Sequence, residues 1–135
     1  MTDKELLLTA IKEMEKSYSP YSNCKVGAAL LCKSGRVFTG TNIENAAFSP
    51  TICAERVAIF KAISEGERDF VKIAVAGGKN GVIEGVFAPC GVCRQVMREF
   101  CDDNFKIILG KSENEFEEVT LKDLLPLSFS PDNVR

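Results

Sequence analysis

Apolar residues recur with the period of a helix near the start of the chain. They stand three or four positions apart, with charged residues between them, at Leu7, Ile11, Met14 and Tyr18. This spacing predicts an amphipathic helix over residues 4–18. The Ser19-Pro20 pair predicts its end, because proline lacks an N–H group and disfavours helical backbone in the residue before it.

The following residues are predicted to form short strands and further helices. Two apolar runs, 25–32 and 36–40, flank Lys33-Ser34-Gly35, which predicts a β-hairpin with glycine in the turn. Residues 53–65 are apolar nearly all the way round, which predicts a helix buried against a sheet. The other expected elements are strands at 70–76, 105–109 and 116–120 and helices at 90–100 and 121–125.

This order of elements predicts a mixed sheet with helices on both faces, an α/β fold of the three-layer α/β/α sandwich type. The chain of 135 residues has the size of one domain, and no repeat, low-complexity tract or linker divides it. We therefore expect a single domain over residues 1–135. Residues 77–85 are expected to form a glycine-rich, irregular connection.

The most informative feature of the composition is the absence of histidine, which limits the possible chemistry. Without imidazole, Ser-His-Asp and Cys-His nucleophiles and zinc sites with nitrogen ligands are excluded. Proton transfer near neutral pH must then use a carboxylate, lysine, tyrosine or cysteine with a shifted pKa. The net charge of −2 argues against binding to nucleic acid, which requires a basic face.

The location of the protein is predicted from its first residues and its six cysteines. Met1-Thr2-Asp3-Lys4-Glu5 lacks the basic head of a secretory signal, and no apolar stretch approaches the roughly 20 residues of a membrane span. Six cysteines without an export signal indicate a reducing compartment, where thiols are metal ligands or buried residues more often than disulfides. We expect a cytoplasmic protein that does not bind membranes.

Three cysteines are placed to bind a soft metal ion. Cys90 and Cys93 are three positions apart at the expected start of one helix, and Cys53 stands at the expected start of another. Helix N-termini favour thiolate over thiol. Three sulfurs leave one position of a tetrahedral zinc ion open, as in a catalytic site. A fourth ligand from the remaining cysteines would instead make a structural site; the residues available are Cys24, Cys32 and Cys101.

Glu55 favours the catalytic alternative. It follows Cys53 by two positions, and residues two apart in a helix do not face each other, so it can reach the open side of the metal only if Cys53 is the helix cap. A metal-ligating residue, one intervening residue, a glutamate that does not bind the metal and then Pro-Cys-x-x-Cys is the arrangement of zinc nucleobase deaminases.

The whole chain resembles the small, homotetrameric cytidine deaminases with three cysteine ligands. The motifs that carry this resemblance are Ser19-Pro20-Tyr21-Ser22, Val26-Gly27-Ala28-Ala29-Leu30, Asn42-Ile43-Glu44-Asn45-Ala46-Ala47, Cys53-Ala54-Glu55-Arg56, Pro89-Cys90-Gly91-Val92-Cys93-Arg94-Gln95 and Leu124-Leu125-Pro126 with Phe129. The resemblance implies the cytidine deaminase fold, one zinc ion per subunit held by Cys53, Cys90 and Cys93, and a homotetramer with shared active sites. Glu55 would then be the proton shuttle.

The resemblance also implies the residues that bind a nucleoside. Asn42 and Glu44 resemble the pair that binds the ribose, and the Ala54 N–H resembles the contact to the pyrimidine carbonyl. Phe129 resembles an aromatic residue that stacks on the base from a neighbouring subunit. Taken alone, Asn42 and Glu44 would be turn and surface residues, and Phe129 would anchor the C-terminal tail. Cys24 stands where the family commonly has phenylalanine, which would widen that wall of the pocket.

Two arginines adjoin the expected site. Three thiolates and Zn²⁺ leave one net negative charge, which weakens the metal as a Lewis acid, and arginine can donate hydrogen bonds to thiolate. The resemblance supports Arg56 in this role. Arg94 has only its adjacency to Cys93, and a surface or interface salt bridge is an equal alternative.

The resemblance implies hydrolytic deamination of cytidine and deoxycytidine to uridine and deoxyuridine, with release of ammonia, as in pyrimidine salvage. One alternative is a relative that deaminates a modified cytosine nucleoside such as blasticidin S. A polynucleotide deaminase would be expected to have a basic, aromatic-rich groove. From another class, a zinc-stabilised structural module without activity would have four sulfur ligands.

Overall fold

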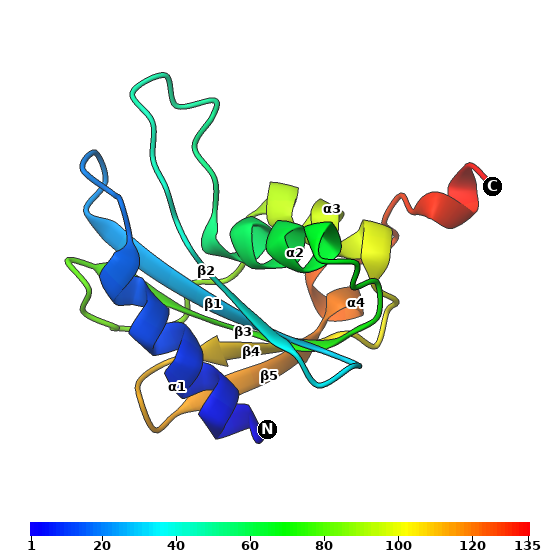
Figure 1. Ribbon diagram of the computed structural model, residues 1–135, viewed down its shortest axis with the longest axis horizontal. Coiled ribbons are helices and arrows are strands. Elements are labelled where there is room, and N and C mark those ends of the chain that lie inside the picture. The colour runs from blue at the N-terminus through cyan, green and yellow to red at the C-terminus, as the bar shows by residue number, and fades with distance from the viewer.

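Five strands form one mixed sheet in the computed structural model, which describes residues 1–135 (Figure 1). The strand order is β2-β1-β3-β4-β5; β3 and β4 are parallel and the other neighbours are antiparallel. The strands are β1 (Cys24–Cys32), β2 (Val37–Thr41), β3 (Phe70–Lys79), β4 (Lys106–Gly110) and β5 (Phe116–Thr120).

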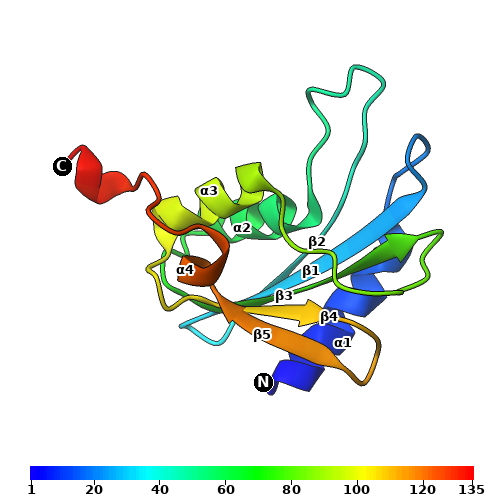
Figure 2. The same ribbon diagram turned by 180° about the vertical axis from the view of Figure 1, so that it is seen from behind.

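Helices cover both faces of this sheet, as the two opposite views show (Figures 1 and 2). The helices are α1 (Asp3–Glu13), α2 (Ala54–Ser64), α3 (Gly91–Phe100) and α4 (Leu121–Leu124), with 3-10 turns η1 (Met14–Lys16) and η2 (Pro131–Asn133). Helix α1 lies on one face and the other three on the opposite face, so the predicted three-layer sandwich is confirmed. None of these helices has the length and apolar character needed to cross a membrane.

The central strands bury side chains on both faces because successive residues point in opposite directions. In β3, Ile73 and Val75 pack in the apolar cluster under α2, α3 and α4. Ala74 and Ala76 pack in a second cluster under α1. The small alanines let α1 lie close to the sheet, and the larger residues fill the layer beneath the helices that carry the cysteines.

The first helix is shorter than its apolar spacing predicts. It ends at Glu13 and continues as the 3-10 turn η1, while Tyr18 lies beyond the helical segment in a parallel bridge to Ile43. The Tyr18 N–H donates to the Asn42 carbonyl oxygen at 3.1 Å. This partner is remote in sequence, so a local helical period could not reveal it.

Strand β3 is longer than predicted because two glycines belong to it. Gly77 and Gly78 pair with Val26 and Lys25 of β1. A Cβ atom on Gly77 would lie 2.8 Å from Cδ2 of Phe87, so the missing side chain makes room for the segment that returns towards α3. The irregular connection therefore covers residues 80–90 rather than 77–85.

Gly40 allows the first turn of α2 to lie directly on β2. A Cβ atom at this position would be 2.3 Å from the Ala54 carbonyl oxygen and 2.7 Å from the Ala58 nitrogen. Both are backbone atoms of a helix, which cannot move without displacing the whole turn. Since Cys53 is the N-cap of α2, this contact sets the height of the metal-binding helix end above the sheet.

We predict that Gly40→Ala lowers the free energy of unfolding by about 2–3 kcal/mol, because the added methyl group must push α2 away from the sheet. Urea denaturation measures this loss, and the zinc content of the purified protein should fall with it. Gly110→Ala is the matched control, since its Cβ would meet chiefly the flexible end of Leu7, at 2.6 Å from Cδ1. Equal losses in the two variants would contradict the role given to Gly40.

Candidate metal centre and active site

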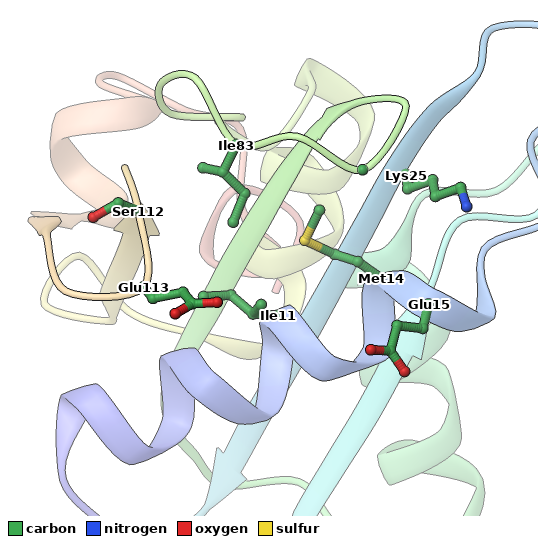
Figure 3. A pocket seen from close by; sticks show the side chains of 8 residues that line it. Ile11, Met14, Glu15, Lys25, Ile83, Ser112 and Glu113 are labelled. Atoms are coloured by element: carbon green, nitrogen blue, oxygen red, sulfur yellow. The ribbon is translucent and has the colours of Figure 1, made fainter.

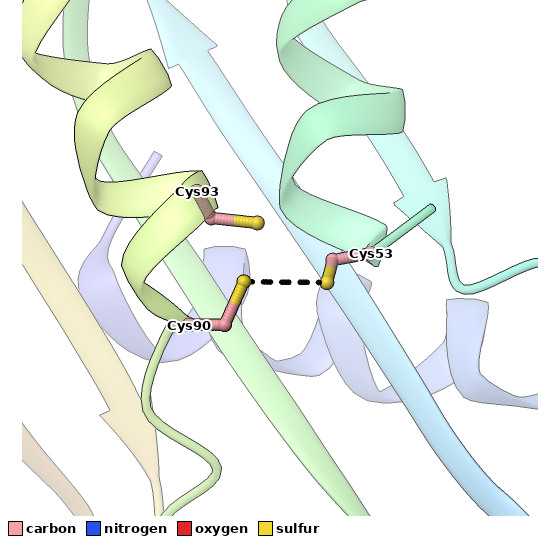
Figure 4. A group of neighbouring side chains, drawn as sticks. All are labelled: Cys53, Cys90 and Cys93. Carbon is pink, nitrogen blue, oxygen red and sulfur yellow. Dashed lines mark hydrogen bonds between the residues drawn. The ribbon is translucent and has the colours of Figure 1, made fainter. Parts of the chain in front are cut away.

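Two helix N-termini bring three cysteines together (Figure 4). Cys53 is the N-cap of α2, Cys90 is the N-cap of α3, and Cys93 lies in the first turn of α3. Neither cap side chain makes a capping hydrogen bond, so both sulfurs are free to bind a ligand. The Sγ atoms of Cys53 and Cys90 are 3.6 Å apart, and all three sulfurs lie within 4.8 Å of one another.

This arrangement fits a zinc ion. Sulfur ligands about 2.3 Å from a tetrahedral zinc ion lie about 3.8 Å from each other, close to the separation seen between Cys53 and Cys90. The cluster contains no carboxylate and no further cysteine; Cys24, Cys32 and Cys101 lie outside it. The cluster of three predicted from the sequence is therefore confirmed, and the four-cysteine structural site is not formed.

The cysteine sulfurs need positive charge beside them. The pKa of Cys53 is lowered to about 5, because the Cys93 thiol and the Arg56 guanidinium donate hydrogen bonds to its sulfur and outweigh the effect of burial. Arg56 Nη2 lies 3.5 Å from Cys53 Sγ. The pKa of Cys93 is raised, because Cys93 is the donor in their shared hydrogen bond and is itself buried. Full ionisation of the cluster therefore calls for a cation, which a divalent metal supplies.

Glu55 is a buried carboxyl group in the same helical turn. It follows Cys53 and Ala54 at the start of α2 and is only 3% exposed. Its carboxyl group forms no ion pair and accepts a hydrogen bond from its own backbone N–H. Burial, with a smaller contribution from the nearby Cys53 charge, raises the pKa of Glu55 to about 7, so this group can gain and lose a proton near neutral pH.

A β-bridge places the Asn42–Glu44 segment beside the cysteine on α2. Ile43 and Ile52 form an antiparallel bridge in which each N–H donates to the other carbonyl oxygen at 3.0 Å. Asn42 therefore lies across this bridge from Cys53. Because side chains alternate along extended chains, Asn42 and Glu44 point to one side and Ile43 to the other. The structure thus brings both predicted residues to the segment that leads into the metal centre.

The Asn42 amide is buried and already holds three partners. Its Oδ1 accepts hydrogen bonds from the Val26 N–H at 3.0 Å and the Ser17 hydroxyl at 2.6 Å, while its Nδ2 donates to the Cys24 carbonyl at 2.8 Å. These contacts fix the orientation of the amide and leave one N–H without a partner. Asn42 can therefore act towards a ligand only as a donor.

Glu44 is held by the turn that precedes β1. Its Oε1 accepts from the N–H groups of Tyr21 and Ser22 at 3.0 and 3.1 Å, and its Oε2 accepts from the Ser22 hydroxyl at 2.5 Å. These hydrogen bonds, led by the Ser22 hydroxyl, lower the pKa of Glu44, so it is a carboxylate at neutral pH. A hollow of about 370 Å³ opens beside it, lined by Tyr21, Ser22, Phe48 and Thr51.

The remaining candidate residues lie at three different places. Ala54 is fully buried, and its N–H precedes the first hydrogen bond of α2, so it is free to donate. Cys24 is the half-buried first residue of β1. Phe129 is 63% exposed on a C-terminal segment that leads away from the 42–52 loop in both views (Figures 1 and 2). Its carbonyl oxygen accepts a hydrogen bond from Gln95 of α3 at 2.9 Å, and its ring has no aromatic neighbour in its own chain.

A hollow elsewhere on the molecule is separate from this centre (Figure 3). It measures about 390 Å³ and lies between α1 and the turns that follow β3 and β4. Its walls include Ile11, Met14 and Ile83, with Lys25 and Glu113 among the charged residues at its edge. It contains no cysteine and so takes no part in the metal centre.

Residues 1–109 match the family model of the cytidine and deoxycytidylate deaminase zinc-binding region. The chain belongs to this deaminase family. A curated cytidine deaminase of Halalkalibacterium halodurans is 46% identical over 133 residues, which are 98% of this chain and 98% of the relative. The crystal structure of cytidine deaminase from Burkholderia pseudomallei has a TM-score of 0.88 at 43% identity and covers 96% of this chain and 100% of its own.

A relative that is named for another substrate is more distant. The blasticidin-S deaminase of Bacillus cereus is 30% identical over 132 residues, which are 95% of this chain and 92% of the relative. The deaminase family thus includes both chemistries that the sequence analysis considered, and the cytidine deaminase named above is the more similar.

The residues that orient Asn42 and Glu44 were not predicted from the sequence. Ser17 holds Asn42 and lies in no motif, and Ser22 holds Glu44 but was given no role within its motif. Within its own chain, Arg94 forms neither a hydrogen bond to a thiolate nor a surface salt bridge. It donates to the Pro89 carbonyl at 2.7 Å and to the Leu124 carbonyl at 2.8 Å, rather than to a thiolate or a carboxylate. The contacts of Ser17 and Arg94 are made to groups that only the folded structure brings near, so no sequence pattern could have indicated them.

We predict that Arg56→Ala leaves the protein folded but weakens zinc binding about 10–100-fold, because the cluster loses the hydrogen bond that offsets its negative charge. Competition with a chromogenic chelator measures the affinity. Arg68→Ala is the control, since Arg68 is exposed and donates only to the carbonyls of Ile63 and Glu67. Wild-type affinity in Arg56→Ala would refute the charge-offset argument.

Proposed function

We propose that this protein catalyses the zinc-dependent hydrolytic deamination of cytidine and deoxycytidine to uridine and deoxyuridine, with release of ammonia. The observation that carries the proposal is a three-sulfur centre with no fourth protein ligand, in the same helical turn as a buried glutamate. A purely structural zinc site has four protein ligands and no need for such a carboxyl group. The similarity to curated cytidine deaminases supports the same reaction.

The chemistry of the site follows from its residues. When bound by Cys53, Cys90 and Cys93, zinc would lower the pKa of a coordinated water and make a nucleophile available near neutral pH. Glu55 would accept a proton from the attacking water and deliver it to N3 of the cytosine ring, which makes C4 electrophilic. With the water oxygen bonded to C4, Glu55 would then take the second proton from this hydroxyl and deliver it to the amino nitrogen, so that the C4–N bond breaks, ammonia leaves and the C4 carbonyl of uridine forms. No imidazole is needed, in keeping with a chain that has none.

The nucleoside contacts divide between donors and an acceptor. The free N–H of Asn42 would donate to a sugar hydroxyl, and Glu44 Oε2 would accept from one, since it holds only the Ser22 hydroxyl. The N–H of Ala54 would donate to the pyrimidine carbonyl. Cys24 stands at the start of β1, where its carbonyl accepts from Asn42, so its side chain would border the sugar.

The assembly proposed is a homotetramer with shared active sites. Phe129 on the C-terminal segment is exposed and its ring has no aromatic neighbour in its own chain, which favours stacking on the base bound by a neighbouring subunit. Leu127 on the same segment is fully exposed, as is expected of a residue that a partner would cover. We also propose a cytoplasmic location, because six unpaired cysteines, three of them metal ligands, require a reducing environment.

We predict that the wild-type protein converts cytidine and deoxycytidine, and that Glu55→Gln lowers kcat at least about 10²-fold, because no other group can carry the protons. The loss of ultraviolet absorbance on incubation with cytidine, deoxycytidine or blasticidin S measures the reaction. Glu55→Gln should keep its zinc, since Glu55 lies outside the sulfur cluster.

The matched control is Glu15→Gln, which removes an exposed carboxylate near the end of the first helical segment. It should turn over like the wild type. Conversion of blasticidin S alone would replace the proposed substrate with the modified nucleoside. Turnover by Glu55→Gln at the wild-type rate would refute the single-shuttle mechanism.

A further inference from the structure

The Arg94 side chain makes a hydrogen bond back to Pro89, so the two bonded residues flank both cysteines of α3 in the sequence. Its Nε donates to the Pro89 carbonyl at 2.7 Å, so the side chain that follows Cys93 binds the residue that precedes Cys90. Its Nη1 donates to the Leu124 carbonyl at 2.8 Å, at the end of α4. One planar, half-buried group thus joins the metal-binding turn to a second helix.

The segment that leads into Cys90 is held by the packing of Ile83 and the buried Pro89, and by very few hydrogen bonds. Residues 83–89 take part in no backbone–backbone hydrogen bond, and the contact from Arg94 to Pro89 is the only hydrogen bond that they make. Pro89 has no N–H of its own to offer. Cys90 makes no capping hydrogen bond and its thiol is exposed, so the conformation of this ligand depends on the turn before it.

The other end of the contact is firmly placed. Leu121 of α4 is fully buried in the main core, and Leu124 packs against the same cluster. A capping box formed by Thr120 and Asp123 fixes the start of this short helix. The Leu124 carbonyl therefore offers a rigid anchor, and the two hydrogen bonds of Arg94 transmit that rigidity to the Pro89-Cys90 turn.

We propose that Arg94 is a positioning residue for the zinc ligand Cys90, acting by bridging the Pro89 and Leu124 carbonyls. Arg94 donates only to backbone carbonyls and not to a thiolate. Arg56, in contrast, donates to the Cys53 sulfur. Residues that orient metal ligands typically change metal affinity 10–100-fold when removed. The proposal rests on the zinc site of the proposed function but does not require that cytidine be the substrate.

The test compares zinc affinity in four full-length proteins by competition with a chromogenic chelator in the absence of substrate. Arg94→Met keeps much of the length of the side chain and removes every donor. Arg94→Lys keeps the charge but replaces the fixed planar fork with one flexible ammonium group, which cannot reproduce the geometry of the Nε and Nη1 contacts. Gln95→Ala is the control, because Gln95 is next on α3 and its side chain donates to the Phe129 carbonyl rather than to residues 83–90.

We expect zinc affinity to fall about 10–100-fold in Arg94→Met, to be intermediate in Arg94→Lys and to be unchanged in Gln95→Ala. Melting temperatures of the metal-free proteins give the second readout. A role in general stability alone would lower the melting temperature of Arg94→Met and leave its zinc affinity at the wild-type value, which would overturn the proposal.

The lysine variant separates positioning from charge. Wild-type zinc affinity in Arg94→Lys would show that positive charge alone suffices, and this also would overturn the proposal. If Arg94→Met does not fold, the lysine variant decides. A wild-type protein that binds zinc but does not deaminate cytidine would defeat the proposed function and leave this test intact, because zinc affinity is measured without substrate.

Discussion

Electrostatic repulsion among three closely spaced sulfurs is the constraint on which the active end of this molecule depends. Cys53, Cys90 and Cys93 lie within 4.8 Å of one another, and ionising all three requires a cation between them. The N-termini of α2 and α3 supply part of the positive potential. A zinc ion would supply the remainder and join the two helix ends, so the position of each helix becomes a condition of metal binding. Gly40 sets that position for α2, and Arg94 helps to set it for α3.

The same constraint accounts for the residues that surround the metal. Three thiolates give a zinc site one net negative charge, and Arg56 offsets it through its hydrogen bond to Cys53. Burial of Glu55 beside these sulfurs raises the pKa of its carboxyl group to about 7, where a proton can be taken and returned. An all-sulfur centre, an arginine beside it and one glutamate for proton transfer therefore form a consistent set in a chain without histidine.

The sequence predicts the parts of this arrangement that depend on local spacing. The helical period places Cys53 at a helix cap, and the three-residue step from Cys90 to Cys93 puts both sulfurs on one helical face. Contacts between remote segments could not be predicted in this way. Gly77 and Gly78 suggest a loop until their pairing with β1 is known. The partner of Arg94 at Leu124 is likewise set by tertiary packing rather than by adjacency.

X-ray absorption at the zinc edge of the purified protein shows whether the zinc ion has three sulfur ligands and a position for water. A catalytic centre held by Cys53, Cys90 and Cys93 predicts three sulfur neighbours at about 2.3 Å and one oxygen or nitrogen neighbour at about 2.0 Å. Four sulfur neighbours would rule out a catalytic centre, because the metal would then have no position for water. The buried glutamate would then have no proton to transfer.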